Sequence, residues 1–310
     1  MSYLGAPYLE DPRRSSIQIL LALIIIATNS TNCYIFSCFR NIKITHYYNI
    51  ALAVADLLVS FMLLTGASLI IRGDSVSSEL CQSCGMMFML PLEITVLLHC
   101  LMSIDKCRAI INPIDYRTYT IQHSKARTRT ILQLVAAFIS PVIINTVFTQ
   151  TGIVRLYFEP ILGVCFVVWD IKSVLAFSIF SLWPMVVQLV TYGMIVSKIV
   201  KLNKFNRRRL VRTVRTVVII IASFYICWLP NLVYIVWTIV RNSQDHPSPL
   251  AFYITGMIAV VNSCLSMPIY SYTMAEYRQL LPGFLSSRVS ALKQSTAERT
   301  SVTKVATTIT

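Results

Sequence analysis

Charged side chains inside and at the ends of apolar runs are the residues of this chain that could do chemistry. Asp56 and Glu93 each stand alone within a long apolar run, whereas Asp105, Lys106 and Arg108 cluster at the end of one. An ionisable side chain within a membrane is costly, and is by default a functional site. Glu93 is either a counter-ion for a ligand or a protonated acid bonded to a neighbouring helix.

The nine cysteines do not form a metal-binding pattern. Cys81 and Cys84 form one CxxC, with no second pair to complete a zinc site. Most of the others lie inside apolar runs, which is typical of small buried side chains: Cys33, Cys38, Cys100, Cys227 and Cys264.

The composition indicates a membrane protein. Of the 310 residues, 55% are hydrophobic and 13% are charged, whereas a soluble domain carries about 25% charged residues. A soluble protein this apolar would expose large apolar surfaces. Residues 1–16 lack the apolar core of a cleavable signal peptide, so we expect the first apolar run to act as the insertion signal.

Seven runs are long and apolar enough to span a bilayer, which takes about 20 residues. They cover residues 17–39, 47–71, 81–107, 130–149, 173–200, 212–240 and 249–272. Some of them contain proline, which membrane helices tolerate because neighbouring groups bond the freed carbonyls. The sequence therefore predicts an all-α membrane protein, a seven-transmembrane helix bundle.

Lysine and arginine alternate between the two sides of this bundle. Of 27 such residues, 21 lie in segments 40–46, 106–129 and 198–215 and after residue 272, and the other six lie in the intervening segments. The positive-inside rule then predicts a multi-pass plasma-membrane protein with its N-terminus outside and its C-terminus in the cytoplasm. This topology, with contact to anionic lipid, explains the net charge of +14 and excludes nucleic acid as the partner.

Five different short motifs follow one another along the spans. They are LAVADLL at 52–58, DKCRAIINPIDY at 105–116, Pro184 with Tyr192, FxxCWxP at 224–230, and NSCLSMPIY at 262–270. Together they resemble the motifs of the class A (rhodopsin-like) G-protein-coupled receptors. The resemblance implies a receptor and no enzyme, which transmits binding of an extracellular ligand to a heterotrimeric G protein by outward motion of the sixth helix.

The resemblance also implies a division of the chain. Residues 1–16 would be an extracellular N-terminus, 17–272 the seven-transmembrane domain, 273–285 a short cytoplasmic amphipathic helix and 286–310 a disordered cytoplasmic tail. The serine and threonine residues of the tail are either merely solvated or phosphorylated by receptor kinases to dock arrestin.

By register, the resemblance predicts a ligand cavity with a mainly apolar wall. Its residues are Phe88, Met89, Leu92, Phe177, Phe180, Trp228, Asn231, Leu232, Ile235, Gly256 and Val260. Asn231 is its main polar group, which suits a small apolar or lipid-like ligand or the tip of a peptide. Phe88 stands where amine receptors carry aspartate, so we expect no aminergic ligand. Without a lysine in the seventh span, a retinal Schiff base is excluded.

Three further sites follow from the resemblance. Cys81 would form an extracellular disulfide with Cys165, with Cys84 as the competing partner. We expect no cofactor apart from a possible sodium ion at Asp56, and the alternative role of Asp56 is to join helices as a hydrogen-bonding hub. The possible sodium site comprises Asp56, Thr95, Asn262 and Ser263, with Ser266 nearby. The activation switch comprises Asp105, Lys106, Pro184, Tyr192, Phe224, Trp228, Pro230 and Tyr270.

The motifs also depart from the family pattern. Lys106 replaces an arginine, and a lysine cannot form the planar fork of a guanidinium. The family's acid on span six falls at about Leu210, which leaves no ionic contact there, and Ser266-Met267 replaces Asn-Pro. A receptor-like protein without G-protein coupling therefore stays an alternative. A seven-span transporter is less favoured, because the sequence has no internal repeat.

Overall fold

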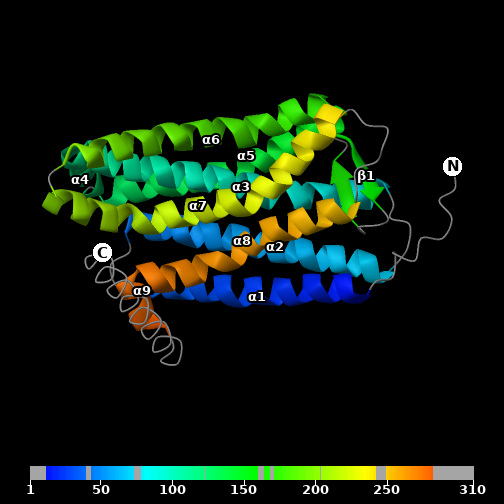
Figure 1. Ribbon diagram of the computed structural model, residues 1–310, viewed down its shortest axis with the longest axis horizontal. Coiled ribbons are helices and arrows are strands. Elements are labelled where there is room, and N and C mark those ends of the chain that lie inside the picture. The colour runs from blue at the N-terminus through cyan, green and yellow to red at the C-terminus, as the bar shows by residue number, and fades with distance from the viewer. Residues whose placement is uncertain are drawn as a thin grey trace, which may run out of the picture.

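The computed structural model describes residues 12–39, 43–72, 78–121, 123–159, 164–167, 171–202, 204–241 and 249–281. Its elements are α1 (Pro12–Ser37), α2 (Ile44–Arg72), α3 (Ser78–Ile111), α4 (Pro113–Ile121), α5 (His123–Gln150), β1 (Leu156–Glu159), β2 (Val164–Val167), α6 (Ile171–Val200), α7 (Lys204–Arg241), α8 (Pro249–Thr273) and α9 (Ala275–Leu280). The long helices run side by side, with α4 and α9 at one end of the bundle and β1 at the other (Figure 1). We call these the α4 end and the hairpin end.

The seven predicted spans are confirmed. Within the described residues, α1, α2, α3, α5, α6, α7 and α8 each contain a segment long and apolar enough to cross a membrane. The helices extend beyond the apolar runs: α5 begins at His123 and α3 continues to Ile111. Helix ends of this kind reach past the hydrocarbon core into the headgroup region.

Three short elements, β1, β2 and α4, were missing from the sequence-based interpretation. The antiparallel strands β1 and β2 form a hairpin in which Phe158 is paired with Cys165. Their apolar, aromatic and β-branched residues, separated by Pro160 and Gly163, are a strand signal that the search for long apolar runs passes over. Helix α4 begins with Pro113, a favoured first residue of a helix.

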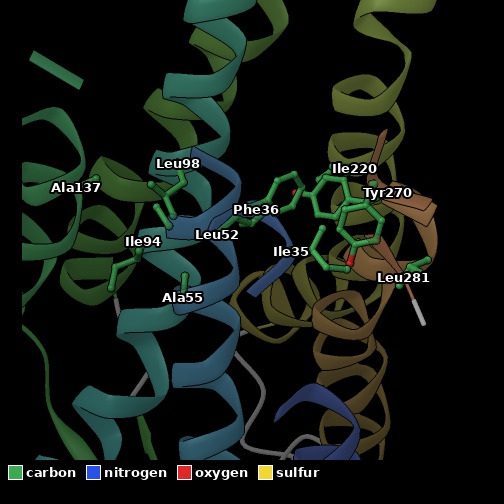
Figure 2. Packing of buried hydrophobic residues seen from close by; sticks show 12 residues of the cluster. Ile35, Phe36, Leu52, Ala55, Ile94, Leu98, Ala137, Ile220, Tyr270 and Leu281 are labelled. Carbon is green, nitrogen blue, oxygen red and sulfur yellow. The ribbon is translucent and has the colours of Figure 1, made fainter. Parts of the chain in front are cut away.

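A central apolar cluster of described residues joins α1, α2, α3, α5, α7, α8 and α9. Ile94 and Leu98 of α3 pack with Leu52 of α2, and Phe36 of α1 packs with Tyr270 of α8 (Figure 2). The outer faces stay apolar, as Trp183 shows with 67% of its surface exposed. Exposed apolar residues on spanning helices match the hydrocarbon around them.

Buried polar residues connect α1 to α8 and α9. The Asn29 amide donates to the Ser263 carbonyl at 2.8 Å, and the Asn32 amide donates to the Ser266 hydroxyl at 3.0 Å. The Tyr277 hydroxyl donates to the Asn32 amide oxygen at 2.5 Å. Helix α9, which lies within the predicted amphipathic segment 273–285, is thereby held against α1. Residues 1–11 of the expected N-terminus and the expected tail 286–310 lie outside the described residues.

Candidate functional site

A cavity of about 30 Å³ lies within the bundle between α2, α3, α7 and α8. It is lined by Val59, Met62, Pro91, Leu92, Thr95, Phe224, Trp228, Asn231, Gly256, Ala259, Val260, Asn262 and Ser263. This volume holds about two or three water molecules, since one water needs roughly 10–15 Å³ on the same measure. A ligand larger than that requires the walls to move.

The cavity brings together part of the predicted ligand set. Of the predicted residues, it is lined by Leu92, Trp228, Asn231, Gly256 and Val260. Met89, Leu232 and Ile235 do not line it. The side chains of Phe88, Phe177 and Phe180 lie outside the described part of the structure. The cavity thus extends more deeply toward Thr95 and Asn262 than the register predicted, and ligand binding by these residues stays a prediction.

Asn231 has a fixed orientation in the cavity wall. It is buried, and its amide oxygen accepts a hydrogen bond from the Thr255 hydroxyl at 3.2 Å. Because that oxygen already accepts one hydrogen bond, the two N–H donors of the amide nitrogen are the main groups that Asn231 offers to a ligand.

The floor of the cavity connects directly to the predicted switch. Phe224 and Trp228 both line it, with their ring centroids 5.9 Å apart. Pro230 interrupts the hydrogen bonding of α7 just beyond Trp228. A ligand that contacts the Trp228 ring therefore acts next to the point where α7 lacks a backbone hydrogen bond.

The residues around Asp56 fit a small cation. Asp56 is 3% exposed and the Ser263 hydroxyl faces its carboxyl group. Thr95, Asn262 and Ser263 line the cavity, and Asp56, which does not line it, is hydrogen-bonded to the Ser263 side chain. Carboxylate, hydroxyl and amide oxygens are the donors that hard cations prefer. Ser266 bonds instead to Asn29, at 3.2 Å. Among the described residues, no group of three or more His, Cys, Asp or Glu could hold a metal ion.

The charged cluster at the end of α3 is internally bonded. The Tyr116 hydroxyl donates to both carboxylate oxygens of Asp105, at 3.1 and 3.3 Å. Burial raises the pKa of Tyr116, and the Asp105 carboxylate raises it further, so the hydroxyl stays protonated. Lys106 Nζ lies 3.7 Å from Asp105 and donates to the Thr45 hydroxyl at 2.6 Å. Lys106 is thus directed toward α2, away from α7.

Apolar packing occupies the place where the family has an ionic contact. Cys107 and Ile110 of α3 pack against Ile195 of α6 and Val214 of α7. Leu210 is one of the half-buried residues packed against these four. We call the four buried residues the α3–α6–α7 cluster. It holds the three helices together at the α4 end, so the structure is closed there.

The two switch tyrosines lie inside the closed bundle. Tyr270 is 1% exposed and packs edge-on against Phe36, with ring centroids 4.9 Å apart. Tyr192 packs beside the α3–α6–α7 cluster, and Pro184 is buried about two turns further along α6 toward the hairpin end. Neither tyrosine hydroxyl has a hydrogen-bond partner among the described residues. Their part in activation stays a prediction.

The structure narrows the predictions for Glu93 and the disulfide. Asn145 of α5 donates a short hydrogen bond to Glu93, which is 2% exposed. This is the helix-joining alternative.

Cys81 is disulfide-bonded and Cys84 is free. The Cys165 side chain lies outside the described part of the structure, so its pairing with Cys81 stays a prediction.

Sequence reasoning missed several buried polar residues. His99 and Gln188 are each 1% exposed in the middle of the bundle, and Asn32 is fully buried in α1. The available signal was a polar residue inside an apolar run, the same signal that singled out Asp56 and Glu93.

Residues 28–270 match the family model for the 7 transmembrane receptor (rhodopsin family). The chain therefore belongs to the rhodopsin family of G-protein-coupled receptors and is a multi-pass membrane protein. The fold is that of squid rhodopsin, whose crystal structure superposes with a TM-score of 0.68 at 14% identity, over 90% of this chain and 85% of that one.

Curated relatives are distant receptors. The chain is 26% identical to G-protein coupled estrogen receptor 1 of Danio rerio over 55% of its own length and 50% of that receptor. It is 25% identical to the fMet-Leu-Phe receptor of Macaca mulatta, over 66% of its own length and 63% of that receptor. The chain thus spans about half to under two thirds of the length of these relatives.

Proposed function

We propose that this receptor couples an extracellular ligand to a heterotrimeric G protein. The observation that carries the proposal is that one helix, α7, lines the cavity with Trp228, contains Pro230 next to it, and contributes Val214 to the α3–α6–α7 cluster. A ligand that favours the open arrangement shifts the equilibrium by its difference in affinity for the two states. In this proposal the α4 end, where the basic residues gather, faces the cytoplasm.

The proposed ligand is non-aminergic, and is small and apolar, lipid-like, or the tip of a peptide. An apolar wall around the Asn231 amide nitrogen favours an apolar molecule that carries one hydrogen-bond acceptor. The names of the two relatives point to an estrogen and to a formylated peptide. Both kinds of molecule combine apolar surface with a few polar groups.

Nucleotide exchange on purified Gα subunits tests the coupling. We expect the full-length receptor in lipid nanodiscs to accelerate exchange on one Gα class, and Lys106→Arg to accelerate exchange on the same class, because both side chains keep a positive charge beside Asp105. A matched control is Arg117→Lys, since Arg117 is exposed on α4.

No exchange with any Gα class, for either receptor, would contradict the coupling and favour a receptor-like protein that does not signal through G proteins. The contact of Lys106 with Thr45 supports that second candidate, because it directs the charge away from the opening. A ligand screen by arrestin recruitment does not depend on G-protein coupling, and it also tests for arrestin and receptor kinases as partners.

We also propose that Asp56, with Thr95, Asn262 and Ser263, holds a sodium ion. Sodium chloride should then stabilise the receptor by about 1–3 kcal/mol over choline chloride when sodium exceeds its dissociation constant roughly 10- to 100-fold. The difference should vanish in Asp56→Asn and persist in Glu93→Gln, because Glu93 is bonded to Asn145. Thermal unfolding in the two salts measures it. An unchanged difference in Asp56→Asn would leave Asp56 as a hydrogen-bonding hub.

A further inference from the structure

One side chain in the middle of the bundle connects three helices. Gln188 of α6 is 1% exposed. Its amide nitrogen donates to the Val96 carbonyl of α3 at 3.3 Å, and its amide oxygen accepts from the Tyr225 hydroxyl of α7 at 3.0 Å. Both ends of the amide are therefore engaged, each with a different helix.

The bond to Tyr225 lies on the Val214 side of Pro230, so a pivot of α7 at Pro230 would break one of the two bonds. Tyr225 precedes Pro230 and lies on the part of α7 that also carries Val214. Val96 belongs to α3, which continues to Cys107 and Ile110. If α7 pivots at Pro230 and its Val214 part moves away from α3, Tyr225 moves with it. Gln188, held to the α3 backbone, cannot follow without losing a bond.

The surroundings make this loss unfavourable. Val217 and Ile221 of α7 pack with Met102 of α3, with Tyr225 among the half-buried residues against them. A buried amide between such side chains has no water to replace a lost partner. Interhelical hydrogen bonds in membrane proteins shift equilibrium constants by about three- to tenfold.

We propose that Gln188 is a positioning residue that holds α7 closed against α3 through the Tyr225 hydroxyl and the Val96 carbonyl. It supplies a polar restraint in the middle of the bundle, whereas Leu210 at the α4 end packs against the apolar α3–α6–α7 cluster. The proposal rests on the proposed function only where it treats the opening of α7 as a signal. The restraint itself shifts the equilibrium between the closed and open receptor whether or not a G protein binds.

Cys107 offers a direct measure of that equilibrium. It is a free cysteine, 6% exposed within the α3–α6–α7 cluster, so a water-soluble maleimide reaches it only when the cluster opens. Its alkylation rate, located by peptide mass spectrometry on the full chain in nanodiscs, is then proportional to the open population even when that population is small.

We expect Tyr225→Phe and Gln188→Leu each to raise the Cys107 alkylation rate about three- to tenfold. The double variant should be no faster than the faster single variant, because both substitutions break the same link. The matched control is Ser223→Ala on α7, since the Ser223 hydroxyl bonds to the Ile220 carbonyl of its own helix, at 2.7 Å, and to no other helix among the described residues. Its rate should equal that of the unsubstituted receptor.

An unchanged rate in Tyr225→Phe, or multiplied effects in the double variant, would overturn the proposal. Tyr225→Phe removes one oxygen atom and decides the matter alone if Gln188→Leu fails to fold. Nucleotide exchange is measured in parallel. Faster alkylation of Cys107 in the variants without any nucleotide exchange would support the restraint and contradict the proposed G-protein coupling. The failure of one proposal can therefore be told from the failure of the other.

Discussion

Replacing Val214 by aspartate is expected to raise ligand-free nucleotide exchange about 100-fold, which corresponds to roughly 3 kcal/mol. Val214 is 4% exposed between Cys107, Ile110 and Ile195, so a carboxylate there has no water and no partner within the cluster. Opening of α7 hydrates the new charge, and the substitution therefore favours the open arrangement. The measurements are basal exchange on the responsive Gα class and the alkylation rate of Cys107.

The helix itself provides the control for this substitution. Val211 lies one turn away on α7 and is 43% exposed, so Val211→Asp adds the same charge without burying it. We expect Val211→Asp to change basal exchange by less than about threefold, as surface substitutions usually do. Equal effects of the two substitutions would show that added charge, and not the apolar closure, controls the equilibrium.

The architecture could be predicted because its signals are local. A run such as 47–71 needs no knowledge of its neighbours to be identified as a span, and α2 occupies it. The cavity could be predicted in part, since Trp228 belongs to the FxxCWxP motif, Asn231 directly follows it, and Gly256 lies close to the NSCLSMPIY motif. Its depth was not, because it depends on how closely α2 and α8 approach.

The polar contacts could not be predicted because they join distant parts of the chain. Gln188 meets Val96, and Asn32 meets Tyr277, only through the angles at which their helices pack. The replacement at Lys106 was visible in the sequence, but its bond to Thr45 depends on where α2 begins. A motif predicts which residue is present, whereas the packing determines what that residue touches.

His99 is a buried side chain in which both polar atoms lack a hydrogen-bond partner among the described residues. It is 1% exposed on α3, its ring lies edge-on to that of Phe224 with centroids 4.9 Å apart, and neither ring nitrogen has a hydrogen-bond partner within the described residues. An unsatisfied buried polar group costs about 1–3 kcal/mol. The closed arrangement carries this cost directly beneath the cavity, next to a residue of the predicted switch.

His99→Leu is therefore expected to stabilise the closed receptor by a net value of roughly 1 kcal/mol, because the gain of about 1–3 kcal/mol is reduced by about 0.5–1.5 kcal/mol for the lost ring contact with Phe224. Thermal unfolding without ligand should shift upward, and the alkylation rate of Cys107 should fall about fivefold. His99→Gln, which keeps a buried polar group, should give neither change. A lower unfolding temperature in His99→Leu would instead mean that the imidazole is satisfied in the membrane-embedded receptor. Opening of α7 moves Phe224 away from His99 and gives water access to the ring, so the leucine should disfavour the open arrangement specifically.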